Sequence, residues 1–105
     1  DRLGALAPPD IARGPRDNEA RQAAERASLA ARRGDYAEAM RLLDEAEALS
    51  PSLAIVYQYR SNVAYLMGDR AAAIAALRKG LAMEPDNELF RENLRRLESA
   101  PRGER

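Results

Sequence analysis

Apolar residues recur every three or four positions through most of the chain, which is the spacing of an amphipathic helix. Ala39, Leu43 and Ala46, for example, stand at i, i+4 and i+7 and therefore share one helix face. Polar and charged residues fill many of the positions between them. Interrupted at its glycine and proline residues, the pattern predicts five helices, at about 17–33, 35–49, 52–67, 69–83 and 88–98.

The residues between these segments are of the kinds that end and begin helices. Gly34 and Gly68 follow the first and third segments, and glycine suits the left-handed conformation just after a helix. Asp35 and Asp69 come next, and we expect each to cap the following helix by accepting a free backbone N–H. Glu38 stands where it would complete a capping box with Asp35.

A proline stops the second segment. Pro51 does so because the residue before a proline avoids helical angles. Pro85 follows the fourth segment in the same way. Both prolines therefore mark the end of a pair of predicted helices.

The chain divides into one helical domain and two short flanking segments. Residues 1–16 are rich in proline and glycine, and we expect them to form an extended lead-in or linker. The helical domain spans 17–98, and Asp17 or Asn18 is expected to cap its first helix. Residues 99–105 are predicted to form a polar tail.

The residues that end and begin the predicted helices recur at a fixed interval along the domain. Gly68 follows Gly34 at the same distance along the chain as Pro85 follows Pro51. Between 34–51 and 68–85, seven of the eighteen aligned positions are identical. Glycine, aspartate, leucine and proline are among them, each at a place where the geometry of a helix pair requires it. The sequence therefore predicts two copies of one helical hairpin.

A period of about 34 residues with two helices in each unit resembles the tetratricopeptide repeat. The repeats would span 20–53 and 54–87, followed by a capping helix at 88–98. Tyr57 matches the large aromatic residue that the family has early in the first helix. Arg26 and Arg60 depart from the pattern, because the family often has leucine there.

The resemblance, together with the scarcity of β-branched residues, implies an all-α chain of tandem helix-turn-helix repeats, a TPR-like α-solenoid with five helices. A single hairpin cannot bury its apolar face alone, so we expect the hairpins to stack and the last helix to seal the open end. The apolar residues of that helix available for sealing are Leu89, Phe90, Leu94 and Leu97.

In this family a stripe of the first helix of each repeat lines a concave groove that holds extended peptides. The resemblance places that stripe, across the two repeats, at Arg21, Ala24, Ser28, Arg32, Ile55, Gln58, Asn62 and Tyr65. Its apolar, amide and phenol groups suit both the backbone and the side chains of a peptide. The alternative is that these residues form an ordinary solvated inner face.

Some relatives in the family grip the terminal carboxylate of chaperone tails with a set of lysine, asparagine and arginine residues. The corresponding positions in this chain carry other residue types: Ala24, Ser28, Tyr59, Leu89 and Asn93. We therefore expect that this clamp is absent.

The composition excludes most catalytic chemistry. Histidine, cysteine and tryptophan are absent, so no disulfide, Cys/His metal site or histidine proton relay can form. The serines have no nucleophile-elbow context, and no phosphate-binding glycine loop is present. Carboxylate pairs such as Asp44 with Glu47 are expected to be solvated. We therefore expect no enzyme, no cofactor and no bound metal.

The charge pattern argues against a nucleic-acid partner. The 17 Lys and Arg residues are balanced by 17 Asp and Glu residues. Arg91, Arg95 and Arg96 lack the interleaved aromatic residues that stack on bases, so we expect them to be solvating charge. Apolar stretches fall far short of ~18 residues, and we expect no insertion into a membrane.

These observations predict a non-catalytic scaffold that binds a peptide or protein segment in its groove. One alternative is homo-oligomerisation through an alanine-rich surface left exposed on the first helix. Another is a C-terminal domain of a larger enzyme, because 2–6 looks faintly like the junction at which some sulfatase-like or phosphatase-like proteins pass into such repeats. The chain begins without Met, which is compatible with a fragment of a longer protein, and the sequence does not decide this. The sequence assigns no cellular compartment.

Overall fold

The computed structural model describes residues 16–99, and this part of the chain is helical without strands, as predicted. The expected lead-in, apart from Arg16, and positions 100–105 of the tail lie outside the described residues. Five helices follow one another in the described part: α3 (Asp17–Arg32), α4 (Tyr36–Leu49), α5 (Ile55–Leu66), α6 (Arg70–Met83) and α7 (Glu88–Ser99).

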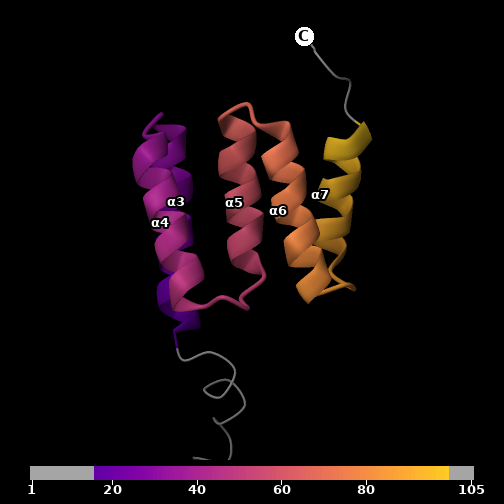
Figure 1. The fold of residues 1–105 in the computed structure, drawn as a ribbon, viewed down its shortest axis with the longest axis horizontal. Coiled ribbons are helices and arrows are strands. Elements are labelled where there is room, and N and C mark those ends of the chain that lie inside the picture. The colour runs from indigo at the N-terminus through magenta and orange to yellow at the C-terminus, as the bar shows by residue number, and fades with distance from the viewer. Residues whose placement is uncertain (1–15, 100–105) are drawn as a thin grey trace, which may run out of the picture.

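The helices stand side by side and alternate in direction, as Figure 1 shows. Helix α3 packs most extensively on α4, and α5 packs on α6, so each pair forms an antiparallel hairpin. Contacts of α3 and α4 with α5 join the two hairpins, and α7 lies against α6. This arrangement is compatible with tandem helical repeats.

The two hairpins have the same local structure at the interval found in the sequence. Helices α4 and α6 each contain 14 residues, and they begin at Tyr36 and Arg70. The preceding glycines, Gly34 and Gly68, have φ angles of 84° and 82°. These values lie in the left-handed region, where glycine avoids the clash of a Cβ atom with the backbone.

The aspartates after these glycines cap the second helix of each hairpin, as predicted. An oxygen of the Asp35 side chain accepts from the backbone N–H of Glu38 at 3.3 Å, and that of Asp69 from Ala72 at 3.0 Å. The capping box expected at Glu38 is incomplete, because its carboxylate binds Arg41 at 2.8 and 2.9 Å instead of returning to Asp35.

Two predictions of how helices begin were wrong. The cap of α3 is Arg16, without a side-chain hydrogen bond, because the Asp17 carboxylate accepts from the Ser50 hydroxyl at 2.5 Å. The third helix begins at Ile55 and not near 52, since a turn closed by the Leu53 N–H on the Ser50 carbonyl precedes it. Helix α7 agrees with its predicted range to within one residue and ends at Ser99.

The first hairpin is built around alanine. All six alanines of α3 are at most 2% exposed, and they share a core cluster with larger residues such as Leu43 and Val56. Small side chains let helices approach to the short end of the usual ~8–10 Å separation. The expected exposed alanine-rich surface on the first helix is therefore wrong, because α4 and α5 cover it.

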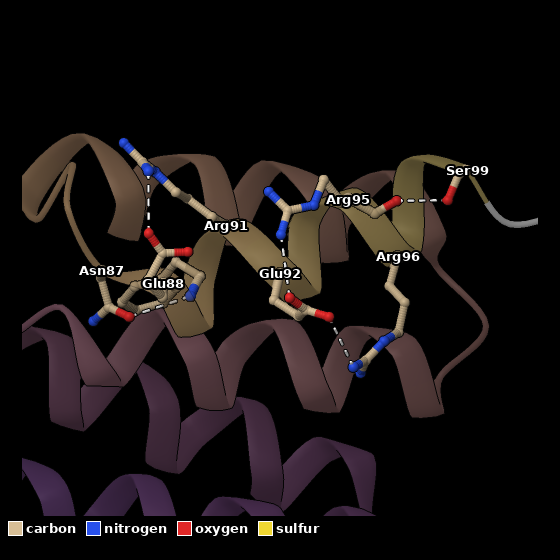
Figure 2. Close-up of polar contacts among 8 residues, drawn as sticks. Asn87, Glu88, Arg91, Glu92, Arg95, Arg96 and Ser99 are labelled. Atoms are coloured by element: carbon tan, nitrogen blue, oxygen red, sulfur yellow. Dashed lines mark hydrogen bonds and ion pairs between the residues drawn. The ribbon is translucent and has the colours of Figure 1, made fainter.

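Helix α7 covers the second hairpin through one apolar face. Phe90 is 1% exposed, and Leu94 and Leu97 pack against the same cluster, as predicted. Leu89 was expected to join them, but it is 51% exposed, because one residue rotates the helix by about 100° and carries its side chain away from the face of Phe90. Figure 2 shows three ion pairs between residues of α7, among them Arg91 bound to Glu88 at 3.2 Å.

The first residues of α4 and α6 each form a hydrogen bond with the C-terminal end of the helix that follows, α5 and α7 respectively. The Tyr36 hydroxyl donates to the Leu66 carbonyl at 3.2 Å. The Arg70 guanidinium donates to the Leu97 carbonyl, with its Nε atom at 2.8 Å. Both bonds satisfy a carbonyl group that the end of a helix leaves without a partner.

Candidate functional site

A line of three side-chain amides connects α5 with α7. Asn93 Nδ2 donates to Gln58 Oε1 at 3.0 Å, and Gln58 Nε2 donates to Asn62 Oδ1 at 3.0 Å. Gln58 and Asn62 are one turn apart on α5, so their side chains lie on the same face. The bond from Asn93 brings α7 to this face and fixes the orientation of the Gln58 amide.

The amide line borders a hollow of about 400 Å³ between α5, α6 and α7. Its polar wall comes from the amides, Ser61, Tyr65 and Arg96, and its apolar wall from Leu77 and Leu97. Such a mixture of an apolar surface with a few placed polar groups is typical of ligand-binding hollows. Tyr65, one of the lining side chains, is 62% exposed, so the hollow is open to solvent.

Two polar groups at the ends of the amide line are available to a ligand. Asn62 uses its oxygen for Gln58, and its Nδ2 group makes no hydrogen bond to another described residue. Asn93 uses its Nδ2 group, and its Oδ1 atom is likewise without a partner in residues 16–99. One end therefore donates and the other accepts, which is the pairing that a peptide group requires.

The structure brings together the part of the predicted stripe that lies on the second repeat. Gln58, Asn62 and Tyr65 line the hollow. Ile55 lies on the same helix and is half-buried, but it does not reach the hollow.

The part of the stripe on the first repeat lies outside the hollow. Arg21 and Arg32 are exposed there, whereas Ala24 is fully buried and Ser28 is 8% exposed. Ala24 and Ser28 offer little surface to a ligand, because they lie on the packed side of the alanine-rich helix α3. The structure therefore places these two predicted groove residues on a packed face and away from the hollow.

Sequence reasoning missed the contribution of α7 to this site. Asn93 and Arg96 line the hollow together with the residues of α5. The repeat itself contained the signal for one of them, because Arg96 follows Asn62 at the interval that separates Gly68 from Gly34. The position of Asn93 depends on the packing of α7, which the repeat does not specify.

A second polar cluster lies outside the hollow and joins three helices. Glu47 of α4 accepts from the Tyr57 hydroxyl at 2.9 Å, from Arg60 at 3.1 Å and from Lys79 of α6 at 3.4 Å. Lys79 also lies over the Tyr57 ring, with its Nζ atom 5.0 Å from the ring centre. Tyr57 is 2% exposed, as expected for a residue packed between helices.

The charges in this cluster shift its titrating groups. Burial acts to raise the pKa of Glu47, but the Tyr57 hydrogen bond and the cations Arg60 and Lys79 outweigh it and lower that pKa. Burial, followed by the bond to Glu47, raises the pKa of Tyr57. The groups are thus held as a carboxylate and a neutral phenol, which makes the cluster a structural tie between the hairpins.

Within residues 16–99, no three or more Asp and Glu side chains gather as they would around a metal ion. Every helix in that range is too short or too polar to cross a bilayer. No family model matches the chain, and no curated protein or solved structure matches it at significant similarity.

Proposed function

We propose that this chain is a non-catalytic interaction scaffold of the tetratricopeptide type, and that it binds an extended segment of another protein in the hollow between α5 and α7. The observation that carries the proposal is the amide line along the hollow, with Asn93 bound to Gln58 and Gln58 bound to Asn62. A free donor at one end and a free acceptor at the other complement a peptide group.

The dimensions of the hollow agree with a short segment rather than a large ligand. Its volume of about 400 Å³ lies in the lower part of the ~300–1,000 Å³ range of ligand sites. Leu77 and Leu97 provide the apolar surface that a buried side chain of the segment would cover. Exposed Tyr65 adds an aromatic contact of low entropic cost, as is common at recognition surfaces.

The repeat also supports a role in binding. The matching lengths of α4 and α6, which begin at equivalent positions of the two repeats, agree with the resemblance to a family of interaction modules. Stacked hairpins expose long faces without catalytic groups, and they use these faces to hold partner chains. The fold and the hollow thus favour the same function.

The proposal can be tested without knowledge of the natural partner. A displayed library of random dodecapeptides is selected on the immobilised chain, and the affinities of synthetic copies of the enriched peptides are measured by calorimetry. We expect Asn62→Ala to weaken binding about two- to twelvefold, because it removes a hydrogen bond of ~0.5–1.5 kcal/mol. Asn62 is exposed on a helix, so alanine at this position keeps the fold.

Gln22→Ala provides the matched control. It removes an exposed amide from α3, outside the hollow, by the same kind of substitution. Its affinity for the peptides should equal that of the original chain. The proposal fails if no peptide is enriched, or if Asn62→Ala and Gln22→Ala bind the enriched peptides equally well.

A further inference from the structure

The hollow contains a single charged lining residue. Of the eight side chains around it, seven are neutral, and the eighth is Arg96 of α7. An anionic group of a ligand placed there would meet this guanidinium and no carboxylate among the lining residues. Arg96 is therefore the residue that gives the hollow an electrostatic preference.

Arg96 is only weakly engaged within the described part of the chain. Its Nη2 atom lies 3.5 Å from Glu92, at the outer limit of a hydrogen bond, and its side chain is 72% exposed. Glu92 has a better partner in Arg95, at 3.1 Å. An anionic ligand can thus bind the Arg96 guanidinium while Arg95 continues to neutralise the charge of Glu92. The guanidinium is able to bind a second carboxylate in its planar fork.

The orientation of Arg96 separates it from its neighbours on α7. Figure 2 shows that Arg96 points away from the side of the helix that carries Arg91 and Arg95. It lies one repeat interval after Asn62, so it occupies the corresponding position on the parallel helix. The free Nδ2 group of Asn62 and the guanidinium of Arg96 line the same hollow, and both of them donate.

We propose that the segment bound in the hollow is acidic, and that Arg96 and Asn62 together bind the carboxylate of one of its aspartate or glutamate side chains. This inference rests on the proposed function and specifies the chemistry of its partner. A carboxylate accepts from both donors at once, whereas the neighbouring apolar part of the segment covers Leu77 and Leu97. Arg96 is thus a specificity-determining residue.

The test uses the same dodecapeptide library on three versions of the chain. On the original chain we expect aspartate or glutamate to be enriched at one position of the peptides. On Arg96→Glu that position should change to lysine or arginine, since the sign of the charge is reversed. Arg95→Gln, on the outer side of α7, is the matched control and should select the same acidic peptides as the original chain.

Synthetic peptides then measure the effect. Replacing the selected acidic residue by its amide should weaken binding to the original chain about three- to tenfold, and should change binding to Arg96→Gln far less. Amidation of the peptide C-terminus should have no effect; if it removes binding, the carboxylate is terminal and the side-chain assignment falls. Raising the salt concentration should weaken the original complex more than that of Arg96→Gln.

The outcomes separate this inference from the proposed function. If peptides are enriched and depend on Asn62, but show no acidic preference, the hollow binds peptides and the role of Arg96 is refuted. If no peptide is enriched on any version, both proposals fall. An acidic preference that is unchanged in Arg96→Glu also overturns the inference, because the charge then lies elsewhere.

Discussion

A Cβ atom placed on Gly80 of α6 would lie 2.8 Å from Cε1 of Phe90 on α7, too close for two carbon atoms. The missing side chain of Gly80 is therefore the space that the Phe90 ring occupies. The residues one repeat earlier are Ala46 of α4 and Val56 of α5, and both are fully buried. The pair of Gly80 and Phe90 therefore has a smaller residue on α6 and a larger one on α7 than the pair of Ala46 and Val56 has at the corresponding positions.

This exchange predicts energetic coupling between the two positions. Gly80→Ala should destabilise the chain by about 1–2 kcal/mol, because overpacking costs ~1–3 kcal/mol and better helix propensity returns up to ~1 kcal/mol. In the Phe90→Leu background the same substitution should cost at least about 1 kcal/mol less. Urea denaturation of the four variants measures the coupling. If the changes in unfolding free energy for Gly80→Ala and Phe90→Leu are strictly additive, the packing of the Phe90 ring does not depend on the glycine.

Glu47 predicts a pH-dependent contribution to stability. Its pKa is lowered in the folded chain, so its stabilising effect is present above the ordinary carboxyl pKa and is lost as the pH falls through the folded value. Glu47→Gln should therefore cost about 1 kcal/mol at neutral pH and progressively less toward pH 3. Denaturation midpoints across this range give the difference between the two proteins.

Glu45→Gln is the control for this prediction. Glu45 is an exposed carboxylate on the same helix, and its one ion pair within residues 16–99 is with Arg41 at 3.7 Å. It should change stability little at any pH, since exposed pairs contribute ~0–1 kcal/mol. A loss for Glu47→Gln that stays constant down to pH 3 would contradict the account of the cluster.

The turn glycines predict a backbone effect that does not depend on packing. A Cβ atom on Gly68 meets nothing within 4 Å, but the φ angle of 82° disfavours any residue with a Cβ. Gly68→Ala should cost about 1–2 kcal/mol, and Gly68→Asn less, because asparagine tolerates the left-handed region better. The unfolding free energies of the two variants are measured by thermal or urea unfolding. Equal stability of Gly68→Ala and the original chain would refute the strain argument.

The sequence predicted the hairpins because their signals are local. Gly34, Asp35 and their counterparts define each turn through backbone angles and a single cap, and neither requires tertiary contacts. The start of α5 was predicted wrongly because the turn at Ser50 is fixed by backbone hydrogen bonds, which cannot be recognised from the residue types. The role of Phe90 in covering the second hairpin followed from its place on the apolar face of α7.

The candidate site was predicted in part for the same reason. Gln58, Asn62 and Tyr65 follow from the helical spacing of α5, which the sequence contains. The contribution of Asn93 depends on where α7 lies, and this depends on the fit of Phe90 to Gly80. Ser28 was expected in the groove, but on the closely packed helix α3 it is only 8% exposed. Whether Asn93 and Ser28 lie at the site therefore depends on the packing of the helices and not on residue type.

The central claim is that the amide-lined hollow holds the partner segment, and nuclear magnetic resonance tests it directly. The chain contains six asparagine and glutamine side chains. Three belong to the site (Gln58, Asn62 and Asn93), and three lie outside it (Asn18, Gln22 and Asn87). Each side-chain amide gives its own pair of signals in a proton–nitrogen spectrum.

A peptide selected on the chain is titrated into the labelled protein while these signals are followed. We predict that the amide signals of Gln58, Asn62 and Asn93 shift together and saturate with the calorimetric affinity, whereas those of Asn18, Gln22 and Asn87 stay in place. Saturable binding that leaves the three site amides unmoved would contradict the account, because the segment would then bind on another face of the molecule.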